Sequence, residues 1–482
     1  DPDGDEWIGS NDGLYHRRGT VMKRYTVKDG LPDNRVISLV ESNGLLYVGT
    51  ALGLVRMDRD GRMEREAAFN GHAVFAMARD HDGGLWIGTL EAGVARYAQN
   101  RVEFFDNPRR TSSKAITAIF EDREGSLWLG ASGAGLGRLR DVPFRNLTTE
   151  DGMPGNLVQT VLAARDGSVW VGYNGAGLSR LDGEQRILGT WSLANGLPSN
   201  DIWCLAEDRD GAVWGGFFGG QVARITSRGV RVYGVAEGLS GKPVLSLMAD
   251  GSGAIWAGTL GGGVAVLANG RTHIYTRADG LAGNHVRVIR QDRRGRVWLG
   301  TDQGVTIYEN GRFQPMLGTE ALSGRLIYSI FEQADGAVWI GAFEGGLARY
   351  RDGRFVTLGP GSGFGPETVF GIIEDGRGGV WISSSNGIFR FESSELNAWA
   401  DGRPGRVRGH AFGVAEGMGS RECNGGQPAA TRSADGQLWF PTMRGLAVVT
   451  PDSLPVNSLA PAVMIEEVRV EGKRHGGNGT VS

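Results

Sequence analysis

Histidine, the residue most often used to bind transition metals, is thinly spread in this chain. A metal site needs several such ligands at short spacing or gathered by the fold. No two histidines show the spacing of a helical zinc site or of a zinc-binding loop. We therefore predict no metal centre and no cofactor from the seven histidines, which are His16, His72, His81, His273, His285, His410 and His475.

Most acidic residues stand in short turns of the form Asp-x-x-Gly, as at Asp208–Gly211 and Asp292–Gly295. A carboxylate that opens such a turn accepts backbone N–H groups, which is a structural role. Glycoside hydrolysis would instead need two carboxyl groups about 5 to 9 Å apart in a cleft, and no pair stands out. Calcium would need about six to eight oxygen ligands, more than one such turn supplies. The acidic residues therefore predict no catalytic residue and no metal site.

Nucleophiles and phosphate-binding motifs are equally sparse. The motifs of zinc proteases, phosphate loops and serine hydrolases are absent from the sequence. Gly261–Gly263 lies in a turn with no helix after it, which makes it a weak phosphate site. Cys204 lies in the apolar run Ile202–Leu205 and reads as a small core residue, and Cys423 is the only other cysteine. These features favour a protein that is not an enzyme and is not held together by disulfides.

A repeated unit positions every one of these residues. Each copy contains the pattern Gly, one or two residues, an aromatic residue, an aliphatic residue and Gly. The aromatic residue recurs about once per unit: 42 residues separate Trp128 from Trp170, and 42 separate Trp256 from Trp298. Repeats of this length indicate a propeller, a solenoid or an array. The marker aromatics are Trp7, Tyr47, Trp86, Trp128, Trp170, Trp214, Trp256, Trp298, Trp339, Trp381 and Trp439.

One unit shows what each copy forms. Between residues 156 and 191, four short β-rich runs alternate with turns rich in Asp, Asn and Gly. Four strands joined in this way make the antiparallel blade of a β-propeller. The first run is almost wholly apolar, which fits a strand buried on both faces, and the marker Trp fits packing between blades with its indole N–H bonded locally. The predicted fold class is all-β, with propeller blades of four antiparallel strands.

The number of markers suggests two rings. Seven lie between Trp170 and Trp439, enough for one ring in the usual range of about four to eight blades, and four precede them. We expect about four blades of an incomplete ring in residues 1–141, a seven-bladed propeller in 142–455, and a linker with the first strand of a truncated Ig-like module in 456–482. The 58 residues from Trp381 to Trp439 predict an inserted loop in the last blade.

Binding residues are expected on one face of the seven-bladed ring. The loop entering the first strand and the loop between the second and third strands emerge together there, and they vary while the frame repeats. Exposed aromatics would stack on a sugar ring, and polar side chains would bind its hydroxyls. The candidates are Tyr173, Asn174, Asn200, Asp201, Phe217, Phe218, Asn284, His285, Arg287, Arg325, Tyr328, Phe343, Glu344, Asn386 and Arg444.

The repeats resemble the two-component regulator propeller family. Its copies read approximately as Gly-Leu-Pro, a spacer, Asn, an apolar strand, Glu-Asp, a turn, Leu-Trp-Ile-Gly-Thr and Gly-Gly-Leu. Asp29–Asn34 and Glu121–Gly130 match this pattern, whereas Tyr47 and Pro441 depart from it. The resemblance implies a periplasmic, ligand-sensing segment of a membrane-spanning receptor, often associated with carbohydrates, whose output is a histidine kinase, a hybrid kinase or a diguanylate cyclase. No such output element occurs in this chain.

Three functions remain open. The favoured one is a non-catalytic sensor for a small molecule or oligosaccharide, acting alone or as a homodimer and joined to a membrane only through segments outside this chain. The alternatives are a polysaccharide lyase or glycosidase, and an adaptor that binds proteins along its rim. A net charge of −3 without a basic stripe gives no case for nucleic acid, and no apolar stretch is long enough for a membrane helix.

Overall fold

The computed structural model describes residues 6–105, 115–316, 322, 324–358 and 362–454, and the backbone of 468–470 and 473–475. The chain divides into two compact units: unit 1 contains the residues up to Asp141, and unit 2 spans Val142–Leu454. The linker expected after Pro455 and most of the strand expected from Ala462 lie outside the described residues. Two short strands are described in that part of the chain, β43 (Val468–Val470) and β44 (Lys473–His475).

The described residues of unit 1 up to Asp141 form four antiparallel sheets in chain order. The first strands of neighbouring sheets contact one another, as in β4 with β8 and β8 with β12. Phe120 and Leu136 of the fourth sheet are 65 % and 68 % exposed, whereas Leu178, the counterpart of Leu136 in unit 2, is fully buried by the next sheet. The strands are β1 (Glu6–Gly9), β2 (Leu14–Arg18) and β3 (Val21–Tyr25); β4 (Val36–Ser42), β5 (Leu45–Thr50), β6 (Gly53–Met57) and β7 (Met63–Glu66); β8 (Val74–Arg79), β9 (Leu85–Thr89), β10 (Val94–Ala98) and β11 (Arg101–Phe105); β12 (Ile116–Glu121), β13 (Leu127–Ala131) and β14 (Gly135–Leu139).

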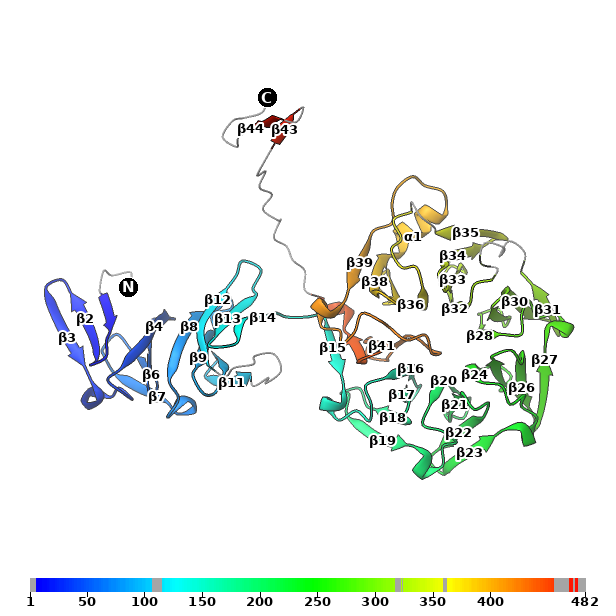
Figure 1. Cartoon of the computed structure of the whole chain (residues 1–482), viewed down its shortest axis with the longest axis horizontal. Coiled ribbons are helices and arrows are strands. Elements are labelled where there is room, and N and C mark those ends of the chain that lie inside the picture. The colour runs from blue at the N-terminus through cyan, green and yellow to red at the C-terminus, as the bar shows by residue number, and fades with distance from the viewer. Residues whose placement is uncertain are drawn as a thin grey trace. The chain divides into compact units, whose positions relative to one another are not determined.

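Unit 2 contains seven four-stranded antiparallel sheets, which Figure 1 shows arranged in a ring. Their first strands line a central channel. This confirms the predicted all-β class and the four-stranded blade. Six sheets are consecutive in sequence: β16 (Val158–Ala163), β17 (Val169–Tyr173), β18 (Leu178–Leu181), β19 (Ile187–Trp191); β20 (Ile202–Glu207), β21 (Val213–Phe217), β22 (Val222–Thr226), β23 (Gly229–Tyr233); β24 (Val244–Ala249), β25 (Ile255–Thr259), β26 (Val264–Ala268), β27 (Arg271–Tyr275); β28 (Val286–Gln291), β29 (Val297–Thr301), β30 (Gly304–Glu309), β31 (Arg312–Pro315); β32 (Ile327–Glu332), β33 (Val338–Ala342), β34 (Gly346–Arg351), β35 (Arg354–Leu358); β36 (Val369–Glu374), β37 (Gly379–Ser384), β38 (Gly387–Glu392), β39 (Gly409–Phe412).

The seventh sheet joins the two ends of unit 2. Its order is β15 (Phe144–Leu147), β42 (Gly445–Val449), β41 (Leu438–Thr442) and β40 (Thr431–Arg432). The outermost strand therefore comes from the start of the unit and pairs in register with its last strand, Phe144 opposite Val449 and Leu147 opposite Leu446. This pairing covers the edge of β42, which would otherwise be free at the join of the ring.

The insertion in unit 2 lies one sheet earlier than the sequence suggests. Helix α1 (Ser393–Ala400) and its following turn stand between β38 and β39, in the sixth sheet rather than the seventh. Leu396 and Ala400 anchor the helix in the core of that sheet. The spacing between Trp381 and Trp439 predicted that this part of the chain contains extra residues. It did not show whether they lie before or after β39, because the spacing gives only the total length.

The repeated tryptophans pack between sheets, as the sequence predicts. Trp298 of β29 is 1 % exposed and shares a cluster with Ile327 and Ile340 of the next sheet. Its indole Nε1 donates to Asp292 Oδ2 at 2.8 Å, and Asp292 Oδ1 accepts the backbone N–H groups of Arg294 and Arg296. The same bond recurs at Asp122 and Trp128, Asp208 and Trp214, Asp250 and Trp256, and Asp375 and Trp381.

We expect the carboxylates of this kind in unit 2 to make its stability depend on pH. Burial alone would raise the pKa of Asp292, but hydrogen bonds from Trp298 and Arg296 outweigh it and lower the pKa. A carboxyl group whose pKa is lower when folded stabilises the fold above its unfolded value, about 3.9, and loses that effect as pH falls through the folded value. We expect Asp292→Asn to be less stable than wild type by about 1–3 kcal/mol at pH 7, a difference that shrinks towards pH 3. Urea denaturation between pH 7 and pH 3 measures this, and a difference independent of pH would contradict it.

Candidate functional site

One face of unit 2 is built by two sets of loops that are tied to each other. Backbone N–H groups in the loops after the second strands donate to carbonyls in the loops that enter the first strands, as Leu260 does to Pro243 and Phe343 to Leu326. The same bond joins Asn174 to Leu157. We call this surface the loop face. The strands below it are rigid, so they hold its side chains at fixed positions.

Single-turn helices precede three of the entering loops of unit 2 and use their Asn residues. In each linker a Thr or Ser caps the turn, and Asn accepts the first backbone N–H, as Asn200 does from Leu193 and Asn284 from Arg277. Asn156 does the same for Thr149. The amide oxygens of Asn200 and Asn284 therefore fix the loops, a role that the sequence did not separate from ligand binding.

The channel segment, residues 423–430, fills the loop-face end of the central channel. Gln427 bonds to the backbone of Trp203 and Leu205, and its side chain donates to Tyr328 O at 2.6 Å. Gly425 and Gly426 permit this approach, because a Cβ on Gly426 would lie 2.2 Å from Gln159 O. Below it lies a channel cavity of about 450 Å³ lined by the first strands.

Arg287 joins the channel segment to two aromatic rings. Its guanidinium lies 4.5 Å from the ring of Tyr328 and 5.6 Å from that of Trp203, and Nη2 donates to Gly425 O at 3.1 Å. Arg287 is 8 % exposed, and burial lowers its pKa. The sequence predicts Arg287 as a ligand contact. In the structure its side chain lies beneath the surface and binds the channel segment through Gly425 O.

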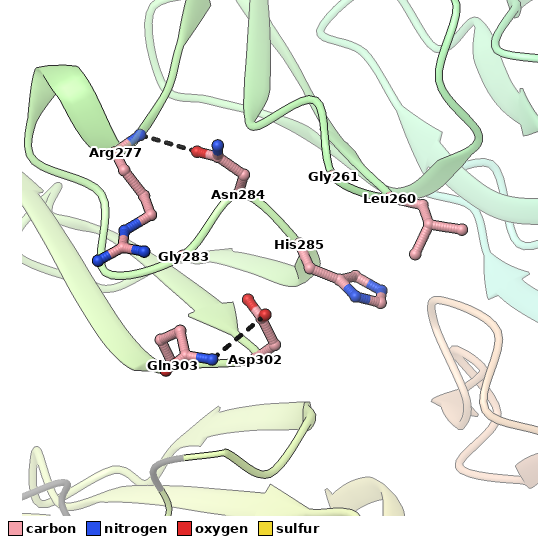
Figure 2. Close-up of a pocket in the computed structure, with 8 residues that line it drawn as sticks. All are labelled: Leu260, Gly261, Arg277, Gly283, Asn284, His285, Asp302 and Gln303. Carbon is pink, nitrogen blue, oxygen red and sulfur yellow. Dashed lines mark hydrogen bonds between the residues drawn. The ribbon is translucent and has the colours of Figure 1, made fainter.

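A pocket of about 340 Å³ opens on the loop face between the third and fourth sheets of unit 2 (Figure 2). Its residues come from the loop after β25, the linker before β28 and the loop after β29. Of the sequence candidates it contains Asn284 and His285. The lining residues are Leu260, Gly261, Arg277, Gly283, Asn284, His285, Asp302 and Gln303.

His285 and Asp302 supply the polar groups of this pocket. Burial lowers the pKa of His285, Asp302 opposes that shift and Arg287 adds to it, so the imidazole is neutral at pH 7 and offers one donor and one acceptor. Asp302 Oδ1 is buried and has no hydrogen-bond partner, while Oδ2 is 3.5 Å from Gln303 Nε2. An unpartnered carboxylate oxygen beside an imidazole suits a ligand rich in hydroxyl groups.

Aromatic side chains flank the pocket on both sides along the ring. Phe218, from the sheet before that of Leu260, is 48 % exposed and lies 5.2 Å from the ring of Trp203. Phe343, from the sheet after that of Asp302, is 41 % exposed and lies 6.3 Å from the ring of Tyr328. These rings offer apolar surfaces next to a polar pocket.

Two candidate aromatics belong to the core instead. Tyr173 and Phe217 are fully buried, which corrects the expectation that they are exposed. Tyr173 OH lies 2.7 Å from Ser179 Oγ, and burial raises its pKa. Each is the last residue of a second strand and packs against the preceding sheet, Tyr173 in a cluster with Trp439 and Phe217 in a cluster with Trp170. One residue in sequence therefore separates Phe217 in the core from Phe218 on the surface.

The other candidates lie on the loop face but outside the pocket. Asp201 accepts from Ser199 Oγ at 3.3 Å, and Glu344 has a positive φ of 48° and donates its N–H to Thr368. Asn386 accepts from Ser384, and Arg444 O accepts from Asn146. Asn174 and Arg325 are exposed. The role of these residues in binding stays a prediction.

Sequence reasoning missed Asp302, Arg277 and Trp203. Asp302 follows Thr301 directly after the second strand. In other copies the sequence predicts a variable binding loop at this position, so the same comparison could have found Asp302. Trp203 lies in an apolar first strand and was read as core. Its ring contact with Phe218 becomes visible only when the strands are placed around the channel.

Metal-ligating side chains and the two cysteines were the remaining sequence candidates for chemistry. Among the residues that the structure describes, no cluster of three His, Cys, Asp or Glu side chains could hold a metal ion. Both cysteines are buried and unpaired, and burial raises the pKa of Cys204 strongly and that of Cys423 to about 12. Neither thiol is suited to act as a nucleophile. No helix in the described residues has the length and apolar character needed to cross a membrane.

Four segments match the two component regulator propeller family: residues 68–91, 112–133, 196–219 and 280–303. Each contains one marker tryptophan, namely Trp86, Trp128, Trp214 or Trp298. The chain therefore carries two component regulator propeller repeats, and the resemblance seen in the sequence is confirmed. The third and fourth segments lie in unit 2, and the fourth includes His285 and Asp302.

Two solved structures from B. thetaiotaomicron share the fold. The extracellular domain ascribed to the hybrid two component system BT3049 matches with a TM-score of 0.79 and 23% identity, over 98% of this chain and 64% of that one. The extracellular domain ascribed to the one component system BT4673 matches with a TM-score of 0.52 and 17% identity, over 94% and 68%. This chain thus spans just under two thirds of the first structure. A comparison with curated proteins found no match.

Proposed function

We propose that this chain is the ligand-sensing part of an extracytoplasmic receptor and that unit 2 binds a polyhydroxylated small molecule, such as an oligosaccharide, without transforming it. The location outside the cytoplasm, in the periplasm, is proposed from the repeat family and from the extracellular origin of the two similar structures. The observation that carries the binding site is the unpartnered Asp302 oxygen beside His285 in an open pocket.

The pocket offers the mixture of groups that a sugar needs. Asp302 accepts hydroxyl protons, the neutral His285 either donates or accepts, and the exposed Arg277 side chain donates (Figure 2). The exposed rings of Phe218 and Phe343 would contact sugar residues that extend beyond the pocket on either side. A ligand bound here lies close to Arg287 and the channel segment, which are candidates to carry a change in conformation.

Loss of the Asp302 charge tests this site. Because a hydrogen bond to a charged group contributes about 1.5–3 kcal/mol, we expect Asp302→Asn to weaken binding of the ligand at least tenfold. The ligand would be found by thermal shift with a panel of neutral oligosaccharides, and its affinity measured by isothermal titration calorimetry. Asp210→Asn is the matched control, because Asp210 is 82 % exposed and lies in a turn at the other end of its sheet. Equal affinity in both variants would place the site elsewhere, and recovery of shortened products would favour the enzyme.

A further inference from the structure

Helix α1 forms a second cavity on the outer side of unit 2, away from the loop face. It has a volume of about 780 Å³ and lies between the end of α1 and the hairpin that joins β34 to β35. Trp399 and Val356 form its apolar part, and both pack on the core of the sixth sheet. Four arginines line the rest: Arg349, Arg351, Arg354 and Arg403.

Two of the arginines take part in ion pairs around the helix and the hairpin. Arg349 is 5 % exposed, donates to Asn397 Oδ1 at 3.0 Å and forms an ion pair with Asp401. Arg351 pairs with Asp335 at 3.0 Å. The last carbonyls of α1 are also satisfied, since Ala398 O accepts the N–H of Arg403. The negative end of the helix is thus already neutralised on this side.

Arg354 and Arg403 do not hold the helix or the hairpin, although the charge of Arg403 adds to that of Arg349 in lowering the pKa of Asp401. Both are exposed, and among the described residues neither forms an ion pair or a side-chain hydrogen bond. Asp352, the remaining carboxylate of the cavity, is 89 % exposed on its side chain and is 3.6 Å from Arg351. The cavity therefore presents two unpaired guanidinium groups beside the half-buried indole of Trp399.

The neighbouring sheet shows that this arrangement comes from α1. Arg312 occupies the same position in the β30–β31 hairpin, opposite Glu309, as Arg354 does opposite Arg351. An arginine at this point of a hairpin is thus ordinary in the repeat. In the fifth sheet, however, the helix inserted in the neighbouring sixth sheet places the indole of Trp399 and the exposed Arg403 next to Arg354.

We propose that this cavity binds an anionic sugar, with its carboxylate or sulfate held by Arg354 and Arg403 and its ring stacked on Trp399. Guanidinium groups bind both oxyanions through paired, charge-assisted hydrogen bonds, so the site recognises the shared chemistry of the two. The aromatic ring selects for an oxyanion attached to a sugar ring over the free ion. The site is distinct from the Asp302 pocket and does not depend on it.

Calorimetry on the full chain with four ligands tests the site: cellobiouronic acid, cellobiose 6-sulfate, cellobiose and inorganic sulfate. We expect one or both anionic disaccharides to bind, and cellobiose and inorganic sulfate to bind at least tenfold more weakly. Whichever anionic disaccharide binds identifies the oxyanion. Binding of cellobiose or of inorganic sulfate with equal affinity would contradict the proposal, as would the absence of binding by both anionic sugars.

Two variants locate the binding. The double variant Arg354→Ala with Arg403→Ala should weaken binding of the anionic disaccharide at least tenfold. The control variant Arg312→Ala should leave its affinity unchanged. All three side chains are exposed, so neither variant should disturb the core. Unchanged affinity in the double variant would overturn the assignment. Asp302→Asn should have no effect here, which separates failure of this site from failure of the loop-face site.

Discussion

Replacing Trp298 with alanine is expected to lower the free energy of unfolding of unit 2 by about 3–5 kcal/mol. The side chain is 1 % exposed and packs against the next sheet, so its removal leaves a cavity between two sheets. It also takes away the indole N–H that Asp292 accepts at 2.8 Å. Urea denaturation followed by circular dichroism measures the change.

Trp191→Ala is the matched control for this prediction. Trp191 lies on the outer strand β19, is only partly buried, and stacks on Trp170 at 4.8 Å. Its loss should cost clearly less than that of Trp298, because fewer contacts are removed and water can fill the space. If both variants were destabilised equally, the repeated tryptophans would not be the main packing element between sheets.

Replacing Phe144–Leu147 with Gly-Ser-Gly-Ser should unfold unit 2 or cause it to associate. Phe144 and Leu147 are each 1 % exposed, and such truncations cost about 2–5 kcal/mol each, which together approach the whole stability of a typical domain. The exposed edge of β42 would also be free to pair with another chain. Size-exclusion chromatography with light scattering and a thermal melt detect either outcome.

The corresponding control changes a turn of similar size. Gly183–Gln185 connects β18 to β19 at the surface, and replacing it with Gly-Ser-Gly should alter the melting temperature little. A strand replacement that left unit 2 as stable and monomeric as this control would show that β15 is dispensable for the ring.

The fold could be predicted because each copy repeats the same physical solution. The spacing of residues such as Trp256 and Trp298 marks a strand of each copy, and in these two copies the Asp-x-x-Gly turn before it provides the acceptor for the indole. Helix α1 and the channel segment escaped prediction because they occur once. Neither carries the repeat, and β40 in the seventh sheet is only two residues long.

The sequence predicted which face of unit 2 carries the candidate site, but not which side chains on that face are exposed. Alternation along a strand does not reveal where the strand ends, so Phe217 and Phe218 could not be told apart, although one is buried and the other is 48 % exposed. Arg287 was read as a surface residue because its aromatic partners, Trp203 and Tyr328, come from other sheets. The sequence predicted His285 as a binding residue, but only the structure shows that Asp302 lines the same pocket.

Hydrogen-exchange mass spectrometry of the full chain, with and without its best oligosaccharide ligand, tests the central claim most directly. The account predicts slower exchange in the loops that line the pocket, residues 259–263, 282–285 and 301–304, with the ligand recovered intact. Asp302→Asn should abolish this protection at the same ligand concentration. Protection confined to other loops, or conversion of the ligand into products, would contradict the account.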